Sequence, residues 1–310
     1  MTAVAGGPAP LGPVPDVVAP RRRLGTWAAA IVVAVVVAAV ARSVATNQNI
    51  DHATIGEYLL DRRILDGLLT TLQLALVAMA LGLVLGVGVA LLRLSSNPVL
   101  SALGWLYVWI FRGTPLLVQV LIWGNFALFA PRLSIGVPFT DVTLASWETN
   151  DVVTRFVASL LALGLHEAAL MAEIIRSGIS AVGTGQTRAA MALGFTRPQL
   201  MRKIVLPQAL RVIVPPTGNQ LVTMLKMTSL VSVIAGGDLL TETQNIAAVN
   251  LRTIELLTVA TIWYLLVISV LSIGQALLER RLGRGYGASG PSSRRRTTSR
   301  PAAVADVMEE

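Results

Sequence analysis

Long apolar segments, separated by short polar or basic connections, constrain this chain more than any other feature. The stretch from Gly67 to Leu92 contains no charged side chain, and other strongly apolar stretches cover residues 24–45, 155–180 and 255–277. A transmembrane helix needs about 20 consecutive, mostly apolar residues, and each stretch is long enough. We therefore expect an all-α, polytopic membrane protein with about six transmembrane helices in a lipid bilayer.

The composition agrees with a membrane location. The 310 residues are 54% hydrophobic and 14% charged, whereas soluble domains average about 25% charged residues. The formal net charge of +8 comes from basic residues beside the apolar segments. This pattern is the positive-inside distribution of a membrane protein, so no nucleic-acid partner is expected. The chain has no cysteine, which excludes disulfides and thiolate metal sites, and we expect no cofactor.

The two ends of the chain differ from its centre. Residues 1–23 are rich in Pro, Gly and Ala, and residues 286–310 in Ser, Arg and Pro, so both are expected to be disordered cytoplasmic tails. The apolar run 24–45 follows a basic triplet, as in a signal peptide. We interpret it instead as an additional N-terminal transmembrane helix, because it begins late and lacks a convincing cleavage site. Residues 64–283 are expected to form the main transmembrane domain.

Residues 98–130 are too long for a single span. As one helix they would extend roughly 50 Å, against a hydrocarbon core of about 30 Å. Thr114 and Pro115 together form a helix-start signal, since Thr is a good N-cap and Pro suits the first helical position. We therefore expect a short interfacial helix over Pro98–Phe111 and a transmembrane helix that starts at Pro115.

The remaining boundaries also rest on proline, glycine and polarity. Pro215-Pro216 is expected to begin the fifth span, and Gly236-Gly237 permits a bend after it. Residues 131–154 are polar and are expected to form a loop on the outer side, and residues 238–254 are also expected to lie outside. Gly82 and Gly86 form a GxxxG pair in the second span, which allows a neighbouring helix to approach closely.

The fourth span contains ionisable residues, which cost at least about 2.5–3.5 kcal/mol each near the centre of a membrane helix. Glu173 and Arg176 are three residues apart, so they can form an ion pair near the cytoplasmic end. Glu167 lies deeper and has no charged partner three or four residues away. It is either a structural carboxyl group buried within the protein or part of a path for a polar or cationic substrate.

Lys226 is expected near the membrane midplane, about 15 Å along the helix from Pro216. It either contacts a substrate carboxylate, pairs with Glu167, or caps the carbonyl groups of a broken helix. Polar residues of the same segment complete a set of candidates for the translocation path. The set comprises Glu167, Asn219, Lys226, Thr228 and Ser229.

The segment 181–206 lies between two apolar spans and is basic, which predicts a cytoplasmic location. Gly185 can stop a helix or begin a turn, and good helix formers follow it. Gly194 supplies a break or a C′ position. Thr196–Gln199 can open a second helix, which Pro207 is expected to limit. The predicted result is a short helix, a turn and a second helix.

The first of these short helices carries an apolar ridge that would suit a groove on a cytosolic partner. The ridge consists of Ala189, Ala190, Met191 and Leu193. The alternatives are an ordinary basic loop and a DNA-type helix-turn-helix on a membrane protein.

The motif GQTRAAMALG, followed by IVLPQALR, resembles the EAA loop of ABC importer permeases, which docks on the ATPase subunit. The strings FRGTPLLVQ, LGLHEAALMAEIIRSGI and LKMTSLVSVIAGGDLL resemble the polar amino-acid branch of that family. For Arg112 and Gln119 in the first string, a helix-start signal is an equal alternative. Arg188 stands where the family usually has Glu, so an acid on the ATPase or a second permease would compensate.

This resemblance implies the type I ABC importer permease fold and a place in the bacterial cytoplasmic membrane, with both termini cytoplasmic. It implies ATPase subunits, an extracytoplasmic solute-binding protein and a second permease subunit as partners. The implied cargo is a polar or charged amino acid or an opine. The residues implied to couple to the ATPase are Gly185, Gln186, Arg188, Ala189, Ala190, Leu193 and Gly194.

ATP hydrolysis is not expected in this chain. The sequence contains no GxxxxGK[ST] phosphate-binding loop, so energy must come from a partner or from an ion gradient. The alternative function is therefore an ion-coupled secondary transporter or channel that uses Glu167 and Lys226 within the membrane. No internal inverted repeat is evident, and this alternative leaves the ordered basic segment unexplained.

Overall fold

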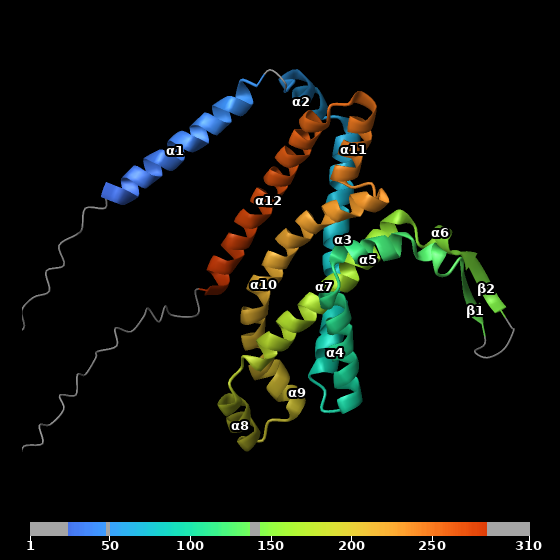
Figure 1. Ribbon diagram of the computed structural model, residues 1–310. Helices are drawn as coiled ribbons and strands as arrows, with labels where there is room; N and C mark the ends of the chain where they lie inside the picture. Colours follow the sequence, from blue (N-terminus) through green and yellow to red (C-terminus); the bar gives the residue numbers. More distant parts are fainter. Residues whose placement is uncertain (1–23, 48–49, 137–142, 284–310) are drawn as a thin grey trace, which may run out of the picture. The chain divides into compact units, whose positions relative to one another are not determined.

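The computed structural model describes residues 24–47, 50–136 and 143–283 (Figure 1). The chain divides into two compact units, Met1–Asp51 and His52–Glu310. In the first unit the described residues form helix α1 (Leu24–Ala45), the predicted additional N-terminal helix, whose side chains from Trp27 to Ala39 are exposed. The predicted tails, residues 1–23 and 286–310, lie outside the described residues.

The second unit is mainly helical. Its first half contains α2 (His52–Leu59), α3 (Arg62–Arg93), α4 (Pro98–Gly113), α5 (Leu116–Gly124), η1 (Phe126–Leu128), β1 (Arg132–Gly136), β2 (Thr143–Glu148) and α6 (Thr149–Val152). Its second half contains α7 (Arg155–Ser180), α8 (Thr184–Ala192), α9 (Arg197–Leu200), η2 (Met201–Val205), α10 (Leu206–Met227), η3 (Thr228–Ile234), α11 (Leu239–Asn250) and α12 (Thr253–Gly283).

Among the described residues, three helices are long and apolar enough to cross a membrane, namely α3, α7 and α12. Two further spans are possible if each bent pair counts as one: α4 with α5, bent by 96°, and Arg197–Ile234 with α11, bent by 44°. The second unit therefore supplies up to five spans by length and composition. Helix α1 contributes only a shorter apolar run, Trp27–Ala39, so the number of about six transmembrane helices stays a prediction.

The close packing of α3 against α7 forms the centre of the second unit (Figure 1). The predicted GxxxG pair lies at this contact. A Cβ atom added at Gly82 would stand 2.6 Å from Cγ of Glu167, and one added at Gly86 would stand 2.7 Å from Cβ of Met171. Ordinary carbon contacts are about 3.5–4.0 Å, so only glycine fits at these two positions without a shift of the neighbouring helix.

The predicted break after Phe111 is present, but the helix that follows is not a full span. The α5 helix has 9 residues and is thus only about 14 Å long. Thr114 ends α4 instead of opening α5, since its hydroxyl donates to the carbonyl of Ile110 at 2.8 Å. The bend is held by Gln119, which is buried and donates from Nε2 to the carbonyl oxygen of Phe111 at 2.9 Å.

The α4 helix was expected at the interface, yet it packs along α3 and α7. The Tyr107 hydroxyl donates to the carbonyl of Leu165 in the middle of α7 at 2.9 Å. Gly104 allows the approach to α3, because a Cβ there would stand 3.1 Å from the backbone nitrogen of Arg93. This packing was not predictable, because composition shows that a helix is apolar but not which helices cover it, and the interfacial location of α4 stays a prediction.

The predicted boundaries at Pro215-Pro216 and Pro207 are wrong. Pro215 and Pro216 lie inside α10, which begins at Leu206. Pro207 also fails to end a helix: α9 continues through the π-helical turn η2 into α10, where Pro207 occupies the first turn. Proline lacks an N–H group and is tolerated at a helix start, and membrane helices accommodate interior prolines through local adjustments.

The segment 238–254, expected to lie on the outer side, contains helix α11, which packs against α3 and α12. Asp238 caps it by accepting hydrogen bonds from the backbone N–H groups of Leu240 at 3.1 Å and Thr241 at 3.2 Å. The Thr71 hydroxyl on α3 accepts from the backbone N–H of Leu239 at 3.0 Å. The predicted bend before α11 is confirmed, and Gly237 there has φ +76°.

Residues 131–154, expected to be a loop, contain the one departure from an all-α fold among the described residues. Strands β1 and β2 form an antiparallel hairpin in which Arg132 pairs with Glu148 and Leu133 with Trp147. The Arg132 Nε group donates to Oε1 of Glu148 at 2.8 Å. The hairpin projects from the helical part of the unit next to α6 (Figure 1).

Candidate coupling segment and transport cavity

The basic segment after α7 folds as the predicted helix, turn and helix, which we call the knob and define as α8, the turn at Leu193–Phe195 and α9. Gly194 has φ +81° and is the C′ residue of α8. Its backbone N–H donates to Met191 at 3.0 Å, and the N–H of Phe195 donates to Ala190 at 3.1 Å. This glycine termination closes α8 and turns the chain into α9.

The start of α9 is also fixed by local hydrogen bonds. Thr196 and Gln199 form a capping box, in which the Thr196 backbone N–H donates to Oε1 of Gln199 at 3.0 Å. Such reciprocal caps satisfy the free donors of a helix start. Gly185 does not stop a helix: it lies in the first turn of α8, which begins after Gly183. The helix therefore begins at Thr184, two residues before the helix formers that start at Gln186.

The predicted apolar ridge of the knob divides into two faces. Leu193 is 79% exposed and Met191 is 50% exposed, and Ala189 is exposed as well. Ala190, by contrast, is only 3% exposed. Arg188 is exposed and makes no ion pair with any residue that the structure describes. A partner would thus meet Leu193, Met191 and Arg188, whereas Ala190 holds the knob together.

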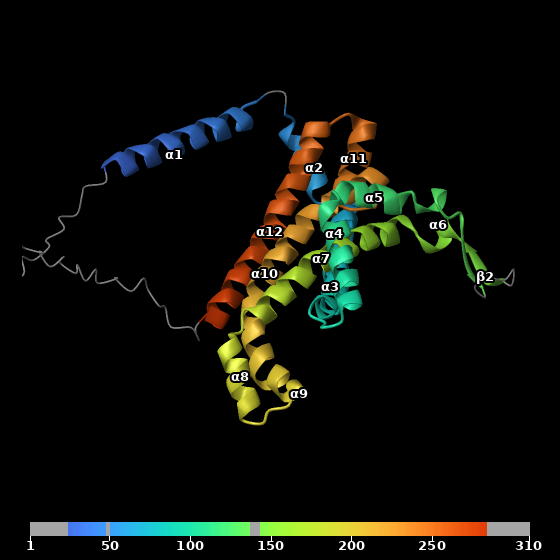
Figure 2. The ribbon, with the colours of Figure 1, turned by 60° about the horizontal axis from the view of Figure 1, so that its bottom comes forward.

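The knob is joined firmly to the rest of the second unit. Gln208 on α10 donates from Nε2 to Oε1 of Gln186 on α8 at 2.7 Å. The helical path from α9 through η2 into α10 and η3 is continuous from Arg197 to Ile234. Figure 2 shows α8 and α9 extending beyond the adjoining ends of α7 and α10. A force on the knob would therefore act directly on α10.

A polar cavity of about 300 Å³ lies between α4, α7 and α10. Its polar lining consists of Arg112, Glu173, Ser177 and Gln220, beside apolar groups such as Leu170. The predicted ion pair is present, since the Arg176 guanidinium contacts the Glu173 carboxylate. Arg93 adds a second cation at 3.6 Å from the same carboxylate. The cavity thus combines cationic, anionic and neutral polar groups, which suits a polar solute.

The five predicted path residues do not meet in this cavity. Their surroundings differ: Glu167 is 1% exposed, with both carboxylate oxygens lacking hydrogen-bond partners among the described residues, and Thr228 is fully buried. Asn219 accepts a hydrogen bond from Gln275 on α12 at 2.7 Å. Lys226 is exposed and forms no ion pair with Glu167, so that predicted alternative is wrong.

Two hydroxyl groups of the fifth span form hydrogen bonds with the backbone of their own helix. Thr228 donates to the carbonyl of Leu225 and Ser229 to that of Lys226, each at 2.7 Å. These bonds satisfy the hydroxyl groups locally where α10 passes into η3. In this conformation both residues support the change of helix type.

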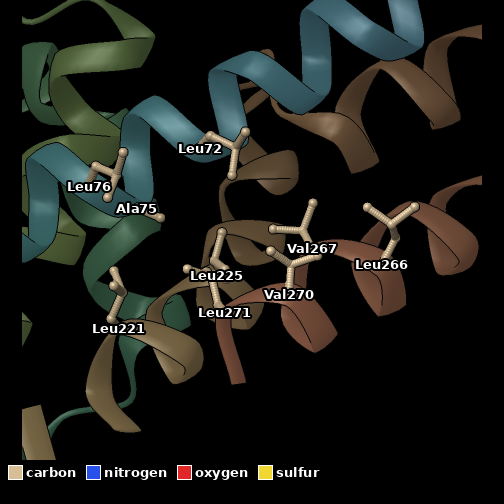
Figure 3. Close-up of a pocket in the computed structure, with 9 residues that line it drawn as sticks. All are labelled: Leu72, Ala75, Leu76, Leu221, Leu225, Leu266, Val267, Val270 and Leu271. Carbon is tan, nitrogen blue, oxygen red and sulfur yellow. The ribbon is translucent and has the colours of Figure 1, made fainter. Parts of the chain in front are cut away.

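A second cavity, between α3, α10 and α12, is apolar (Figure 3). Its volume is about 290 Å³, and its lining is aliphatic throughout, including Leu72, Leu225 and Val270. A polar solute that entered it would lose its hydrogen bonds to water without replacement, which costs roughly 2–7 kcal/mol per group. This cavity is therefore suited to hydrocarbon and not to a polar cargo.

Comparison with known families now identifies the chain. The family described as "Binding-protein-dependent transport system inner membrane component" matches residues 82–284. The match covers every element from α4 to α12, including the knob and the polar cavity. The chain belongs to this family. It is therefore a membrane component of a transport system that depends on a binding protein.

The permease also resembles individual transport proteins over much of its length. It is 40% identical over 296 residues to the arginine transport system permease protein ArgU of Corynebacterium glutamicum, covering 95% of this chain and 90% of the relative. It is 34% identical to the arginine permease protein ArtQ of Bacillus subtilis, covering 71% and 92%. It is 36% identical to the nopaline permease protein NocM of Agrobacterium fabrum, covering 66% and 80%.

Solved structures show the same fold. The crystal structure of an amino acid ABC transporter with histidines matches with a TM-score of 0.64 and 32% identity, over 75% of this chain and 99% of that chain. The inward-facing MetNI methionine ABC transporter matches with a TM-score of 0.54 and 19% identity. The type I ABC permease fold expected from the sequence is thus confirmed.

Family membership also decides between the two functions left open by the sequence. A binding-protein-dependent permease is a subunit of an ABC transport system, which replaces the alternative of an ion-coupled secondary transporter. The permeases that resemble this chain are transport subunits, in agreement with the lack of a phosphate-binding loop in its sequence.

Proposed function

We propose that this permease carries polar or charged amino acids across the bacterial cytoplasmic membrane as part of an ATP-driven importer. In this proposal a separate ATPase hydrolyses ATP, and an extracytoplasmic binding protein delivers the amino acid. A second permease subunit, identical or different, completes the path. Arginine is the first candidate cargo, because two relatives are arginine permeases and each is matched over at least 90% of its own length.

The observation that carries the proposal is the 40% identity to an arginine permease over 95% of this chain. The knob and the polar cavity support it independently. Leu193 and Met191 offer an apolar surface to a cytosolic partner, and the cavity holds charges of both signs. A free amino acid also carries charges of both signs, so the groups are complementary to it.

The proposed orientation places the knob and both termini in the cytoplasm. Basic residues gather at the knob end of the helices, namely Arg93, Arg188, Arg197, Arg202 and Lys203. The positive-inside rule favours retention of such residues in the cytoplasm. The hairpin β1–β2 then lies on the outer side, where a binding protein would approach.

The coupling residues proposed on the knob have separate roles. Leu193, Met191, Ala189 and Arg188 face the ATPase, whereas Ala190, Gln186 and Gly194 hold the knob in shape and Gly185 belongs to the first turn of α8. Movement of the ATPase would tilt α10 through η2 and change the width of the polar cavity. Glu167, Asn219, Lys226, Thr228 and Ser229 would meet the cargo only in another conformation.

The proposal is tested by transport into vesicles that contain the permease with its ATPase and binding protein. Radiolabelled arginine, glutamine, histidine and glutamate are compared with and without ATP. We expect ATP-dependent uptake of at least one amino acid and none without the binding protein. Uptake driven by an ion gradient alone would refute the ATP-driven mechanism, and ATP-dependent uptake of none of the four would refute the amino-acid cargo.

The coupling role of the knob is tested by Gly194→Trp. A side chain at φ +81° costs about 1–2 kcal/mol, and the bulk would change the turn that presents Leu193. We expect the protein to insert normally, with uptake and ATPase binding both reduced at least tenfold. Gly88→Trp is the control, because nothing lies within 4 Å of a Cβ at Gly88. Normal ATPase binding by Gly194→Trp would contradict the assigned role.

A further inference from the structure

The ends of α3 and α7 that lie nearest the knob carry more positive than negative charge. Arg93 is the last residue of α3, and Arg176 lies one turn before the end of α7. Both guanidinium groups share the single carboxylate of Glu173. Arg176 contacts it through two nitrogens, whereas Arg93 remains 3.6 Å away. One positive charge is therefore not neutralised within this cluster.

Arg93 also has hydrogen-bonding capacity to spare. Its guanidinium has five N–H donors, and it donates no side-chain hydrogen bond to any residue within 24–47, 50–136 or 143–283. Its side chain is only 19% exposed. Its nitrogens are not among the buried polar atoms without a partner, so the donors of Arg93 are accessible to an acceptor that comes from outside this chain.

The donors of Arg93 open onto a cavity of about 540 Å³ between the ends of α3, α4 and α7. Arg93, Arg176 and Ser101 supply its polar lining, and Trp105 forms a wall. Guanidinium groups bind phosphate oxygens in a bidentate manner, and Ser101 can add a hydroxyl donor. The lining thus matches a phosphate group in charge and in hydrogen-bonding type.

An apolar groove of about 390 Å³ adjoins this cavity along α4. Pro98 and Ala102 line both, and the groove continues over Val99, Leu103 and Leu106. Leu103 is 53% exposed and Val99 is 65% exposed. A polar pocket that continues into an aliphatic groove matches a molecule with an anionic head and a hydrocarbon chain.

We propose that the Arg93–Arg176 cavity and the adjoining α4 groove bind one anionic phospholipid, with the phosphate at the two arginines and an acyl chain along Val99, Leu103 and Leu106. Trp105 stacks on Trp109 at a centroid distance of 6.0 Å, and tryptophan is enriched at the membrane–water boundary. The assignment to the inner leaflet rests on the proposed orientation of the permease, whereas the binding site itself does not.

The site lies where it can influence coupling. The α3–α4 connection and the knob lie at the same end of the second unit in Figures 1 and 2. Glu173 links the arginine cluster to the polar cavity, because it also lines that cavity. A bound phosphate would draw Arg93 away from Glu173 and thereby alter the charge that the cargo meets.

The test uses the full-length permease in its native assembly, reconstituted with dibrominated phosphatidylglycerol or dibrominated phosphatidylcholine of equal chain length. Bromine quenches tryptophan fluorescence on contact, and the Trp105→Phe variant shows which part of the signal comes from Trp105. We expect the anionic lipid to be preferred at this site by roughly tenfold, which corresponds to about 1.4 kcal/mol. Equal quenching by both lipids would overturn the proposal.

Two pairs of matched variants locate the site. Arg93→Gln should abolish the preference, and Arg62→Gln, at the other end of α3 with a side chain 94% exposed, should retain it. Ala102→Trp should block the shared wall of cavity and groove, whereas Ala80→Trp on the exposed side of α3 should not. Equal effects within either pair would refute the assignment. Arg93→Lys keeps the positive charge and should therefore recover part of the preference for the anionic lipid, which a general folding defect in Arg93→Gln would not explain.

A competition experiment distinguishes a bound lipid from a bound small anion. Millimolar inorganic phosphate or glycerol phosphate is added to the same vesicles. We expect little displacement of the brominated lipid, because the acyl chain adds apolar contact that a free phosphate lacks. Complete displacement would show a small-anion site and overturn the lipid proposal, while ATP-dependent uptake, measured in the same vesicles, reports separately on the proposed function.

Discussion

Gly82→Ala is expected to destabilise the permease although alanine favours helices. The new methyl group would stand 2.6 Å from Cγ of Glu167 and 2.7 Å from its Cβ, about 1 Å inside an ordinary carbon contact. The backbone nitrogen of Ala168 follows at 3.3 Å. Relief therefore requires α3 and α7 to separate, and overpacking of this kind costs about 1–3 kcal/mol.

Gly88→Ala is the matched control for this change. It lies on the same helix, and nothing is within 4 Å of its Cβ position. Both variants gain up to about 1 kcal/mol from the helix preference of alanine over glycine, so this gain cancels in the comparison. Gly82→Ala should thus be less stable than Gly88→Ala by about 1–3 kcal/mol.

The assay is reversible unfolding of the purified protein in mixed detergent micelles, followed by tryptophan fluorescence. The double variant Gly82→Ala/Glu167→Ala removes the Cγ atom but keeps the Cβ, so it should recover part of the loss and show a non-additive free energy. Equal stability of Gly82→Ala and Gly88→Ala would refute the reasoning, because the α3–α7 contact would then have room for a methyl group.

Two further predictions concern buried polar groups. Glu167→Met should raise the free energy of unfolding by about 1–3 kcal/mol, because both carboxylate oxygens are buried without partners among the described residues; a lower free energy of unfolding in the same assay would contradict this. Asp238→Ala should lower the stability of α11 by about 0.5–2 kcal/mol through loss of its cap. Hydrogen exchange should then accelerate at Leu240 and Thr241, and unchanged exchange would contradict the capping role.

The sequence was sufficient for elements that depend on neighbouring residues. The apolar stretch 155–180 corresponds to α7 at both ends, and Thr154 caps its start by accepting from the N–H of Val157 at 3.3 Å. Gly194 and Thr196 were also assigned correctly, because helix caps use contacts within a few residues. For the same reason the Glu173–Arg176 pair was predictable from a spacing of three residues.

The failures concern contacts between distant parts of the chain. The packing of α11 was not predictable from its polar composition, since Thr241 and Thr243 are both buried. The Thr243 hydroxyl donates to the carbonyl of Leu239 at 2.6 Å, and the N–H of Leu239 donates to Thr71, 168 residues away. A hydropathy pattern does not indicate a hydrogen-bond partner that lies so far away in the sequence.

The candidate site was predicted only in part for the same reason. The knob is a local structure, so its turn was accessible from sequence. The polar cavity brings together Arg112, Glu173 and Gln220 from three helices, and no spacing rule relates them. The sequence instead selected Glu167 and Lys226 for their depth, and the structure buries the first and exposes the second.

The π-helical turn η2 determines which way the knob faces. Five residues, Met201–Val205, form this turn between α9 and α10, and such a turn holds one residue more than the α-helix around it. If these residues wound as a regular α-helix instead, the extra residue would turn α9 by about 100° about the axis of α10. Leu193 would then point in another direction. The surface proposed to contact the ATPase would be turned away although all of its residues are unchanged.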